Sequence, residues 1–185
     1  MSANKKDSMN SLANFFITHT PLMPEIAYWG TMKLKISNYI TPVIPPAEFI
    51  SSVRCVLFKE DKIMVIQNPN GENHVMPGGR CEPGETLEET GRREILEEVG
   101  WHMGPLKVIG TRRFHHLTPK PNGYKYPYPD FLQLIYTAEA TLFSVEGKQF
   151  DRYVASAEFY PITAVSKIDL SPGERLFFNT ALQNR

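Results

Sequence analysis

Short apolar runs, several of them alternating with polar residues, recur along the chain and predict β-strands. The runs 51–58 and 62–67 are rich in β-branched residues and flank a short charged turn, so they are predicted to pair with each other. The segment Asn68-Pro69-Asn70-Gly71 is a strong turn signal that ends the second run. The runs predicted to form strands are 32–36, 51–58, 62–67, 106–114, 130–138 and 158–162.

Capping residues mark two helices among these strands. Thr86 and Glu89 form a capping-box pattern, helix-forming residues fill 87–99, and Gly100 follows where a left-handed cap is expected. A C-terminal helix is predicted to begin after Ser171, with Pro172 at its first position.

The N-terminal part of the chain shows a weaker pattern. Residues 1–10 are polar and are predicted to be frayed. Ser11 is the expected N-cap of a short amphipathic helix, which Pro21 and Pro24 would stop.

Prolines at 42, 45 and 46 separate this part from the rest of the chain and suggest a boundary. A segment of this length is too short for a core of its own, so it must pack on the domain or on a partner subunit. We therefore predict an N-terminal extension, 1–48, and a domain, 49–185. The extension is a candidate for dimerisation or for substrate specificity, with a purely structural role as the alternative.

Composition narrows the class of protein. The chain has 185 residues, enough for one domain with a sizeable core, and its 20 basic and 20 acidic residues balance. This balance argues against a dominant nucleic-acid or membrane-surface role, and no apolar run has transmembrane length. Cys55 and Cys81 form neither a zinc pattern nor a disulfide framework, which favours a reduced, cytoplasmic setting.

Three glutamates of the predicted helix 87–99 suggest chemistry. Glu94, Glu97 and Glu98 have spacings that place their side chains within an arc of about 100°. Carboxylates so close together repel each other, and a hard cation such as Mg²⁺ or Mn²⁺ removes this repulsion while it also binds substrate phosphates. The alternative is an acidic helix face exposed to solvent.

The segment 79–101 resembles the Nudix box of the Nudix hydrolases. Gly79 is followed after five residues by Glu85 and, after seven more, by the run from Arg93 to Trp101, which matches the remaining fixed positions. A chance match in a chain of this length is on the order of one in a million. Trp101 stands where the family usually has an aliphatic residue, which changes packing rather than chemistry. The resemblance implies an α/β/α sandwich around a mixed β-sheet.

The resemblance also implies an activity, a cofactor and residue roles. Nudix hydrolases cleave a diphosphate bond in a nucleoside diphosphate linked to another group, with Mg²⁺ or Mn²⁺. Arg93 would hold the carboxylates in place, and Glu85 would support the loop or orient a water. The catalytic base is left open between Glu97, Glu94 and a residue outside the box. The residues that match the family's metal ligands are Gly79, by its carbonyl, Glu94, Glu97 and Glu98.

A long connection, 117–129, is a candidate for substrate contact. It holds four prolines, three tyrosines and two lysines, and such rings and charges could stack on a base and meet phosphate. A surface lid or an interface loop is the alternative. The lesser candidates are Arg112, Arg113, His115 and His116.

The sequence is compatible with several functions. The expected partner is a small-molecule nucleotide rather than a nucleic acid or a membrane, and a homodimer is compatible with the extension. Nucleoside diphosphate sugars, including ADP-ribose, and nucleoside triphosphates are the leading substrates, with a slight preference for the larger conjugates. A non-catalytic nucleotide-binding module and an isomerase acting on a prenyl diphosphate are the other two interpretations.

Overall fold

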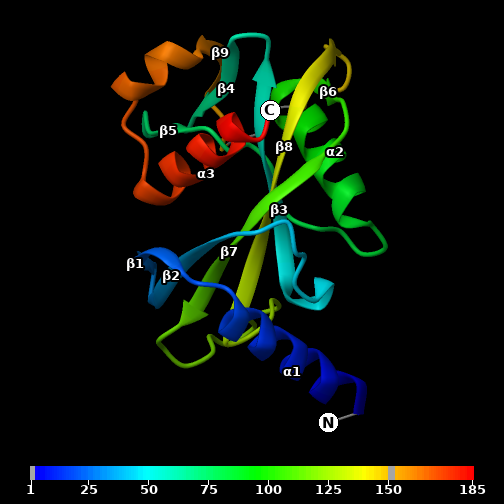
Figure 1. The fold of residues 1–185 in the computed structure, drawn as a ribbon, viewed down its shortest axis with the longest axis vertical. Helices are drawn as coiled ribbons and strands as arrows, with labels where there is room; N and C mark the ends of the chain where they lie inside the picture. The colour runs from blue at the N-terminus through cyan, green and yellow to red at the C-terminus, as the bar shows by residue number, and fades with distance from the viewer. Residues whose placement is uncertain (1–2, 150–152) are drawn as a thin grey trace.

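A curled, mixed β-sheet forms the centre of the molecule in the computed structural model, which describes residues 3–149 and 153–185 (Figure 1). The strand order is β1-β2-β7-β8-β3-β4-β5, with β6 beside β8 and β9 beside β4. β3 and β8 run parallel, and the other neighbouring strands pair antiparallel. The strands are β1 Leu22–Trp29, β2 Met32–Ile40, β3 Ile50–Lys59, β4 Lys62–Gln67, β5 Asn73–His74, β6 Trp101–Met103, β7 Lys107–His116, β8 Asp130–Phe143 and β9 Ser156–Pro161.

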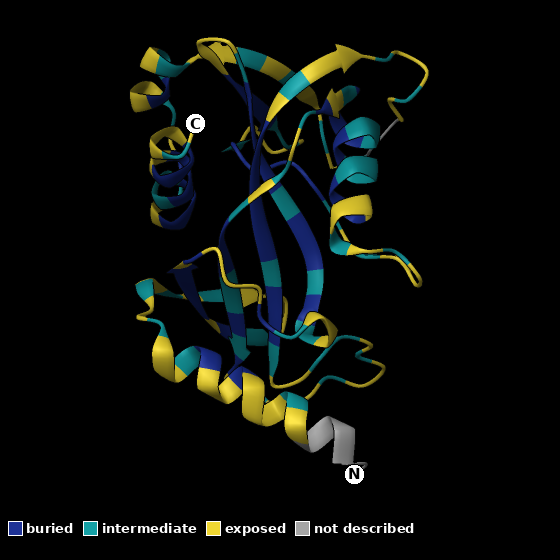
Figure 2. Ribbon diagram, turned by 45° about the vertical axis from the view of Figure 1, so that its right-hand side comes forward, coloured by how far each residue is buried: buried dark blue, intermediate teal, exposed yellow. Residues whose placement is uncertain are grey.

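Helices cover the sheet on both sides, which confirms the predicted α/β/α sandwich (Figure 2). Helix α2 (Leu87–Val99) buries Ile95 and Val99 against one face, and helix α3 (Pro172–Gln183) buries Phe177 and Phe178 against the other. Helix α1 (Ala3–Thr18) lies at the lower end of the molecule in Figure 2. Two 3-10 helices, Ala47–Phe49 and Ile162–Lys167, precede β3 and follow β9.

The N-terminal prediction was wrong in two respects. Helix α1 already begins at Ala3, so Ser11 is not its N-cap. Residues 3–10, which were expected to fray, are helical, and residues 1 and 2 lie outside the described residues. Strand β1 was not predicted at all. It is an edge strand that pairs with β2 on one side only, and five of its eight residues are exposed. Its register with β2 shifts between Leu22 and Glu25, on either side of Pro24.

The N-terminal segment is built into the sheet. β2 pairs with β7 from Leu34–His116 to Ile40–Gly110, and Leu34 is fully buried. From α1, Leu12 and Phe15 are also buried. The strand prediction 32–36 was too short, because β2 continues to Ile40. Whether the chain divides at residue 48 stays a prediction.

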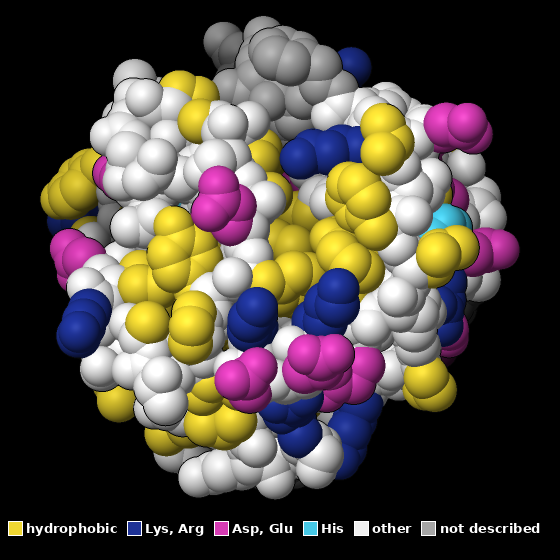
Figure 3. Space-filling view, turned by 90° about the horizontal axis from the view of Figure 1, so that it is seen from above, with side chains coloured by type: hydrophobic (Ala, Val, Ile, Leu, Met, Phe, Trp, Pro, Cys, Tyr) yellow, Lys and Arg dark blue, Asp and Glu magenta, His cyan; other side chains and the backbone are white. Residues whose placement is uncertain are grey.

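The surface at the upper end of Figure 1 carries hydrophobic side chains in its middle, bordered by charged ones (Figure 3). In the elements at this end, Leu142 and Phe143 of β8 and Tyr160 of β9 are exposed. The homodimer stays a prediction. Among the described residues, no helix combines the length and the apolar character needed to cross a membrane.

Candidate active site

The segment that leads into the box, Pro77 to Gly79, runs beside the buried strand β3. The backbone N–H of Cys55 donates to the Pro77 carbonyl and that of Val53 to the Gly79 carbonyl, both at 2.9 Å. Gly78 has φ of +133°, and a Cβ there would collide with the Val53 carbonyl oxygen. This position therefore requires glycine, both for its backbone conformation and for its close approach to β3.

Helix α2 begins and ends as the sequence predicts. Thr86 accepts a hydrogen bond from the Glu89 N–H at 3.2 Å, and the Glu89 carboxylate accepts one from the Thr86 N–H at 2.8 Å, which completes the capping box. Gly100 caps the C-terminus in the left-handed conformation, with φ of +78°. Because Ile95 and Val99 fix one side of the helix, its acidic residues lie at the edge of the core.

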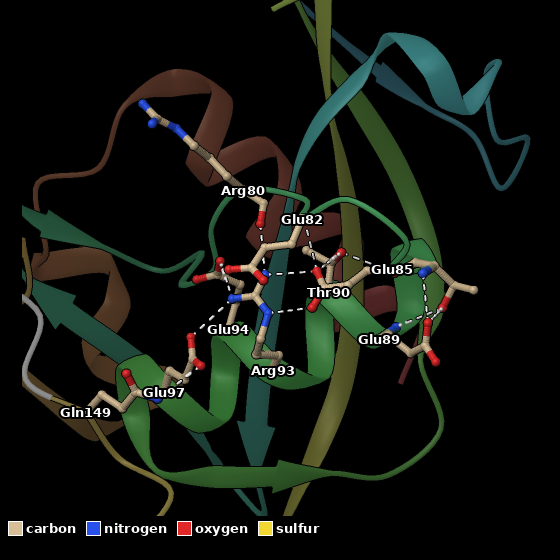
Figure 4. Close-up of polar contacts among 10 residues, drawn as sticks. Arg80, Glu82, Glu85, Glu89, Thr90, Arg93, Glu94, Glu97 and Gln149 are labelled. Atoms are coloured by element: carbon tan, nitrogen blue, oxygen red, sulfur yellow. Dashed lines mark hydrogen bonds and ion pairs between the residues drawn. The ribbon is translucent and has the colours of Figure 1, made fainter. Parts of the chain in front are cut away.

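Arg93 gathers three carboxylates (Figure 4). Its Nε lies 2.6 Å from a Glu85 oxygen, and its Nη1 lies 2.8 Å from Glu94 and 3.1 Å from Glu97. Its Nη2 donates to the Arg80 carbonyl at 2.9 Å, so the same guanidinium also holds the loop. Such charge-assisted hydrogen bonds are stronger than neutral ones, and here they compensate the repulsion among the glutamates.

Glu98 is oriented differently from Glu94 and Glu97. It is buried, with 8% of its surface exposed, and its Oε2 accepts a hydrogen bond from the Gly78 N–H at 2.6 Å. The structure thus places Glu98 beneath the loop, where it contacts the glycine before Gly79, and places Glu94 and Glu97 with Arg93.

The acidic residues differ in their electrostatics. Hydrogen bonds from Arg93, opposed by desolvation, lower the pKa of Glu85 to about 2, and the Glu82 N–H and the Thr90 hydroxyl contribute to this. Desolvation raises the pKa of Glu94, although Arg93 acts in the opposite direction. Glu85 is therefore firmly ionised, whereas Glu94 gains from a further positive charge beside it.

The carboxylates and the Gly79 carbonyl offer oxygen ligands, which suit a hard divalent cation. The space beside Glu94 is the feature that most favours such a cation. A Cβ on Gly79 would occupy the space of the Glu94 carboxylate, so the missing side chain makes room for that group. The Gly79 carbonyl already accepts from Val53, and its second lone pair is suited to a cation. Within the described ranges, no three His, Cys, Asp or Glu side chains are arranged so that they could hold a metal ion. Arg93 instead bonds to both Glu94 and Glu97.

Two adjoining cavities lie beside Arg80, the residue that follows Gly79. The inner one, of about 200 Å³, is lined by Arg54, Arg80, Trp29 and Tyr126 among others. The outer one, of about 530 Å³, extends along the loop 117–129. The expected role of this loop in substrate contact stays a prediction, and it now has a cavity beside it.

The other basic candidates lie away from these cavities. Arg112 donates to Asn38, and both Arg113 and His115 bind Asp130. His116 is buried beneath Tyr124 and Tyr128. The two cavities described above are not lined by any of these four residues.

Four residues at or near the site were not predicted from the sequence. Arg54 donates to the Gly78 carbonyl, Arg80 and Trp29 line the inner cavity, and the Gln149 side chain donates to Glu97 at 3.1 Å. Arg54 gave one usable signal, since it is the one charged residue within the apolar run 51–58. Arg80 directly follows Gly79 in the sequence, whereas Trp29 and Gln149 had no local signal because they come close to the site only through the fold.

The sequence model of the NUDIX domain matches residues 48–180, most of the chain. The chain belongs to the Nudix family. The match begins after β2, so the first three elements of this Nudix protein lie outside it.

Curated relatives of this Nudix protein share part of its sequence. It is 28% identical over 137 residues to the NAD-capped RNA hydrolase NudC of Salmonella agona, a match that covers 69% of this chain and 47% of that protein. It is 30% identical over 76 residues to the putative ADP-ribose pyrophosphatase YjhB of Bacillus subtilis, covering 41% and 36% of the two chains. The chain thus spans less than half the length of these relatives.

Solved structures show the same fold. The pyrophosphohydrolase BsRppH of Bacillus subtilis superposes with a TM-score of 0.60 at 16% identity, over 88% of this chain and 97% of that one. The NUDIX domain of Shewanella oneidensis NrtR, in complex with ADP ribose, gives 0.55 at 19% identity, over 75% and 89%. At these identities the likeness concerns the Nudix fold alone.

Proposed function

We propose that this protein is a divalent-metal-dependent hydrolase that cleaves the diphosphate bond of a nucleoside diphosphate linked to another group. The observation that carries the proposal is the arrangement of Glu94 and Glu97 around Arg93, with Glu98 beneath the loop and Gly79 against Glu94. The proposed metal ligands are Glu94, Glu97, Glu98 and the Gly79 carbonyl, with Mg²⁺ as the cation and Mn²⁺ as an alternative.

The reaction is a hydrolysis at phosphorus. A water oxygen forms a bond to one phosphorus, the bond from that phosphorus to the bridging oxygen breaks, and the bridging oxygen leaves with the other phosphate. When bound, the cation would neutralise charge on the phosphate oxygens and activate the attacking water. Glu97 or Glu94 would accept the proton of that water, and Arg93 and Glu85 would keep the carboxylates in position.

The site and the relatives support one class of substrate. One relative is named a putative ADP-ribose pyrophosphatase and another an NAD-capped RNA hydrolase, and both ADP-ribose and an NAD cap contain a nucleoside diphosphate linked to another group. The cavities beside Arg80 offer room for more than a phosphate chain. We therefore favour such conjugates over nucleoside triphosphates. The balance of 20 basic and 20 acidic residues favours a small molecule over a nucleic acid as the substrate.

The test is hydrolysis of a panel of conjugates and triphosphates with Mg²⁺, Mn²⁺ or chelator, with products separated by ion-exchange chromatography. Glu97→Gln should lose at least about 100-fold in turnover, since even the supporting groups of a metal site are worth about 10- to 100-fold. Glu88→Gln is the matched control, because Glu88 lies on the same helix, is exposed and contacts Arg92 instead.

The outcomes separate the interpretations. Chelator-sensitive hydrolysis that Glu97→Gln abolishes and Glu88→Gln retains would support the enzyme and name its substrate. Equal turnover in both variants would refute the assignment of the site. Nucleotide binding without turnover in the wild type would instead favour a binding module.

A further inference from the structure

The inner cavity has an aromatic side and a cationic side. Trp29 comes from the end of β1, and Tyr124 and Tyr126 come from the loop 117–129, with the two tyrosine rings 5.5 Å apart. Arg54 of β3 and Arg80 lie on the same cavity. Aromatic rings of this kind stack on nucleobases, and arginines bind phosphate.

Arg80 connects this cavity to the carboxylates. Its carbonyl accepts from Arg93, while its guanidinium points away from the carboxylates and lies 5.0 Å from the centre of the Tyr126 ring (Figure 4). Aromatic rings, arginine and carboxylates therefore follow one another in space. This is the order of base, phosphates and cation along a nucleoside diphosphate with its metal.

Trp29 is placed to receive a ring. It packs on Phe114 and Phe131, with ring centres 5.0 Å and 6.1 Å away, yet 44% of its surface is exposed. It lines both cavities. A large aromatic side chain that packs on other rings with one part and is exposed to solvent with another can stack on a ligand ring.

We infer that Trp29, from the segment before the family match, and Tyr126 form the subsite for the nucleobase of the substrate. This inference rests on the proposed function, because the diphosphate must extend from the base past Arg80 to Glu94 and Glu97. The N-terminal hairpin is thus a determinant of substrate specificity. The class of ligand is a nucleoside diphosphate whose base is a planar heteroaromatic ring.

Fluorescence tests base stacking independently of hydrolysis. The chain has two tryptophans, and Trp101 packs on Phe143 and Phe159 rather than in the cavities. In Trp101→Phe, Trp29 remains as the reporter, and ADP with Mg²⁺ should quench its emission. Ribose 5-phosphate should not quench it, because it lacks a base. In Trp29→Phe, the response to ADP should disappear.

Kinetics with the hydrolysed substrate provide the second readout. Trp29→Ala should raise KM by about 5- to 150-fold, the range for loss of one base–aromatic stack, with a smaller effect on kcat. Tyr28→Ala is the matched control, since Tyr28 is the adjacent aromatic residue, is 68% exposed and lines neither cavity. Melting curves establish that each variant is folded.

The results distinguish this inference from the proposed function. Quenching by ADP without hydrolysis would retain the base subsite and refute the enzyme. Hydrolysis with no quenching of Trp29, or with Trp29→Ala and Tyr28→Ala equally active, would retain the enzyme and refute the subsite. Quenching by ribose 5-phosphate to the same extent would assign the cavity to the sugar phosphate and would also overturn the inference.

Discussion

The side chain that Gly79 lacks determines where the Glu94 carboxylate can lie. In Gly79→Ala, the new Cβ would take the space of that carboxylate. We expect about a 100-fold loss of turnover, because a shift of about 1 Å in a reacting group has effects of this size. The change should leave the melting temperature nearly unaltered, since Gly79 does not have a positive φ.

Gly104→Ala is the control for this prediction. A Cβ there would meet only the Glu139 carbonyl at 3.6 Å and Thr141 at 3.8 Å, both ordinary contacts. Kinetics and melting curves of the two variants should therefore differ in activity and agree in stability. Full activity in Gly79→Ala would show that the Glu94 carboxylate is free to act from another position.

At the scale of elements, one ion pair joins β5 to the start of α3. His74 Nδ1 lies 3.2 Å from Glu174, which also accepts from the Ser171 hydroxyl at 3.0 Å. The hydrogen bond to Glu174 raises the pKa of His74, although desolvation opposes it. Desolvation works to raise the pKa of Glu174, but His74, Ser171 and Arg112 outweigh it and lower that pKa.

The signs of these shifts predict a pH-dependent contribution to stability. The raised pKa of His74 stabilises the fold below about pH 6.5, the usual pKa of histidine, and this contribution is lost as pH rises through the folded value. The lowered pKa of Glu174 gives a contribution that is lost as pH falls through its folded value. The pair is therefore most stabilising in mild acid.

His74→Gln should lower the melting temperature most at mildly acidic pH. A charged hydrogen bond at a partly exposed site is worth about 1 kcal/mol, which corresponds to about 2–4 °C in a chain of this size. The difference should shrink as the pH rises, because Gln can replace the neutral hydrogen bond. His102→Gln, at an exposed position, should show no such trend. A difference for His74→Gln that stays constant with pH would contradict this account.

Features of the elements that depend on neighbouring residues could be predicted from the sequence, and features that depend on the assembly of the sheet could not. The limits of α2 follow from Thr86, Glu89 and Gly100, which act within a few residues. Helical spacing places the three glutamates on one side of α2, but the contact of Glu98 with the Gly78 N–H depends on the fold. The sequence of β1 shows no alternation of apolar and polar residues, because β1 is an edge strand with no buried face. The base subsite joins Trp29 to Tyr126 across almost a hundred residues, a pairing that only the strand order β1-β2-β7-β8 produces.

For the molecule as a whole, the N-terminal segment acts as part of the sheet rather than as an appendage. Truncation to residues 49–185 would remove β2 and uncover the edge of β7 together with Phe114, which is buried now. We expect this fragment to be insoluble or to melt without cooperativity, as measured by calorimetry. A chain that lacks only residues 2–19 keeps β1 and β2 and should remain soluble, with a lower melting temperature because Leu12 and Phe15 are lost.

The opposite result would be equally informative. A soluble 49–185 fragment with a cooperative transition would support a domain boundary at residue 48. It would also show that the sheet is complete at β7 without the N-terminal strands.

The order of the segments along the chain has an evolutionary consequence. Trp29 and Tyr126 sit where a hairpin turns and in a loop between strands, whereas the carboxylates sit on one helix with its preceding loop. Mutations that change what the protein recognises therefore fall in different stretches of the gene from those that change how it breaks a bond. Descendants of such a chain can acquire new substrates by exchanging a hairpin and a loop while they inherit the reaction unchanged.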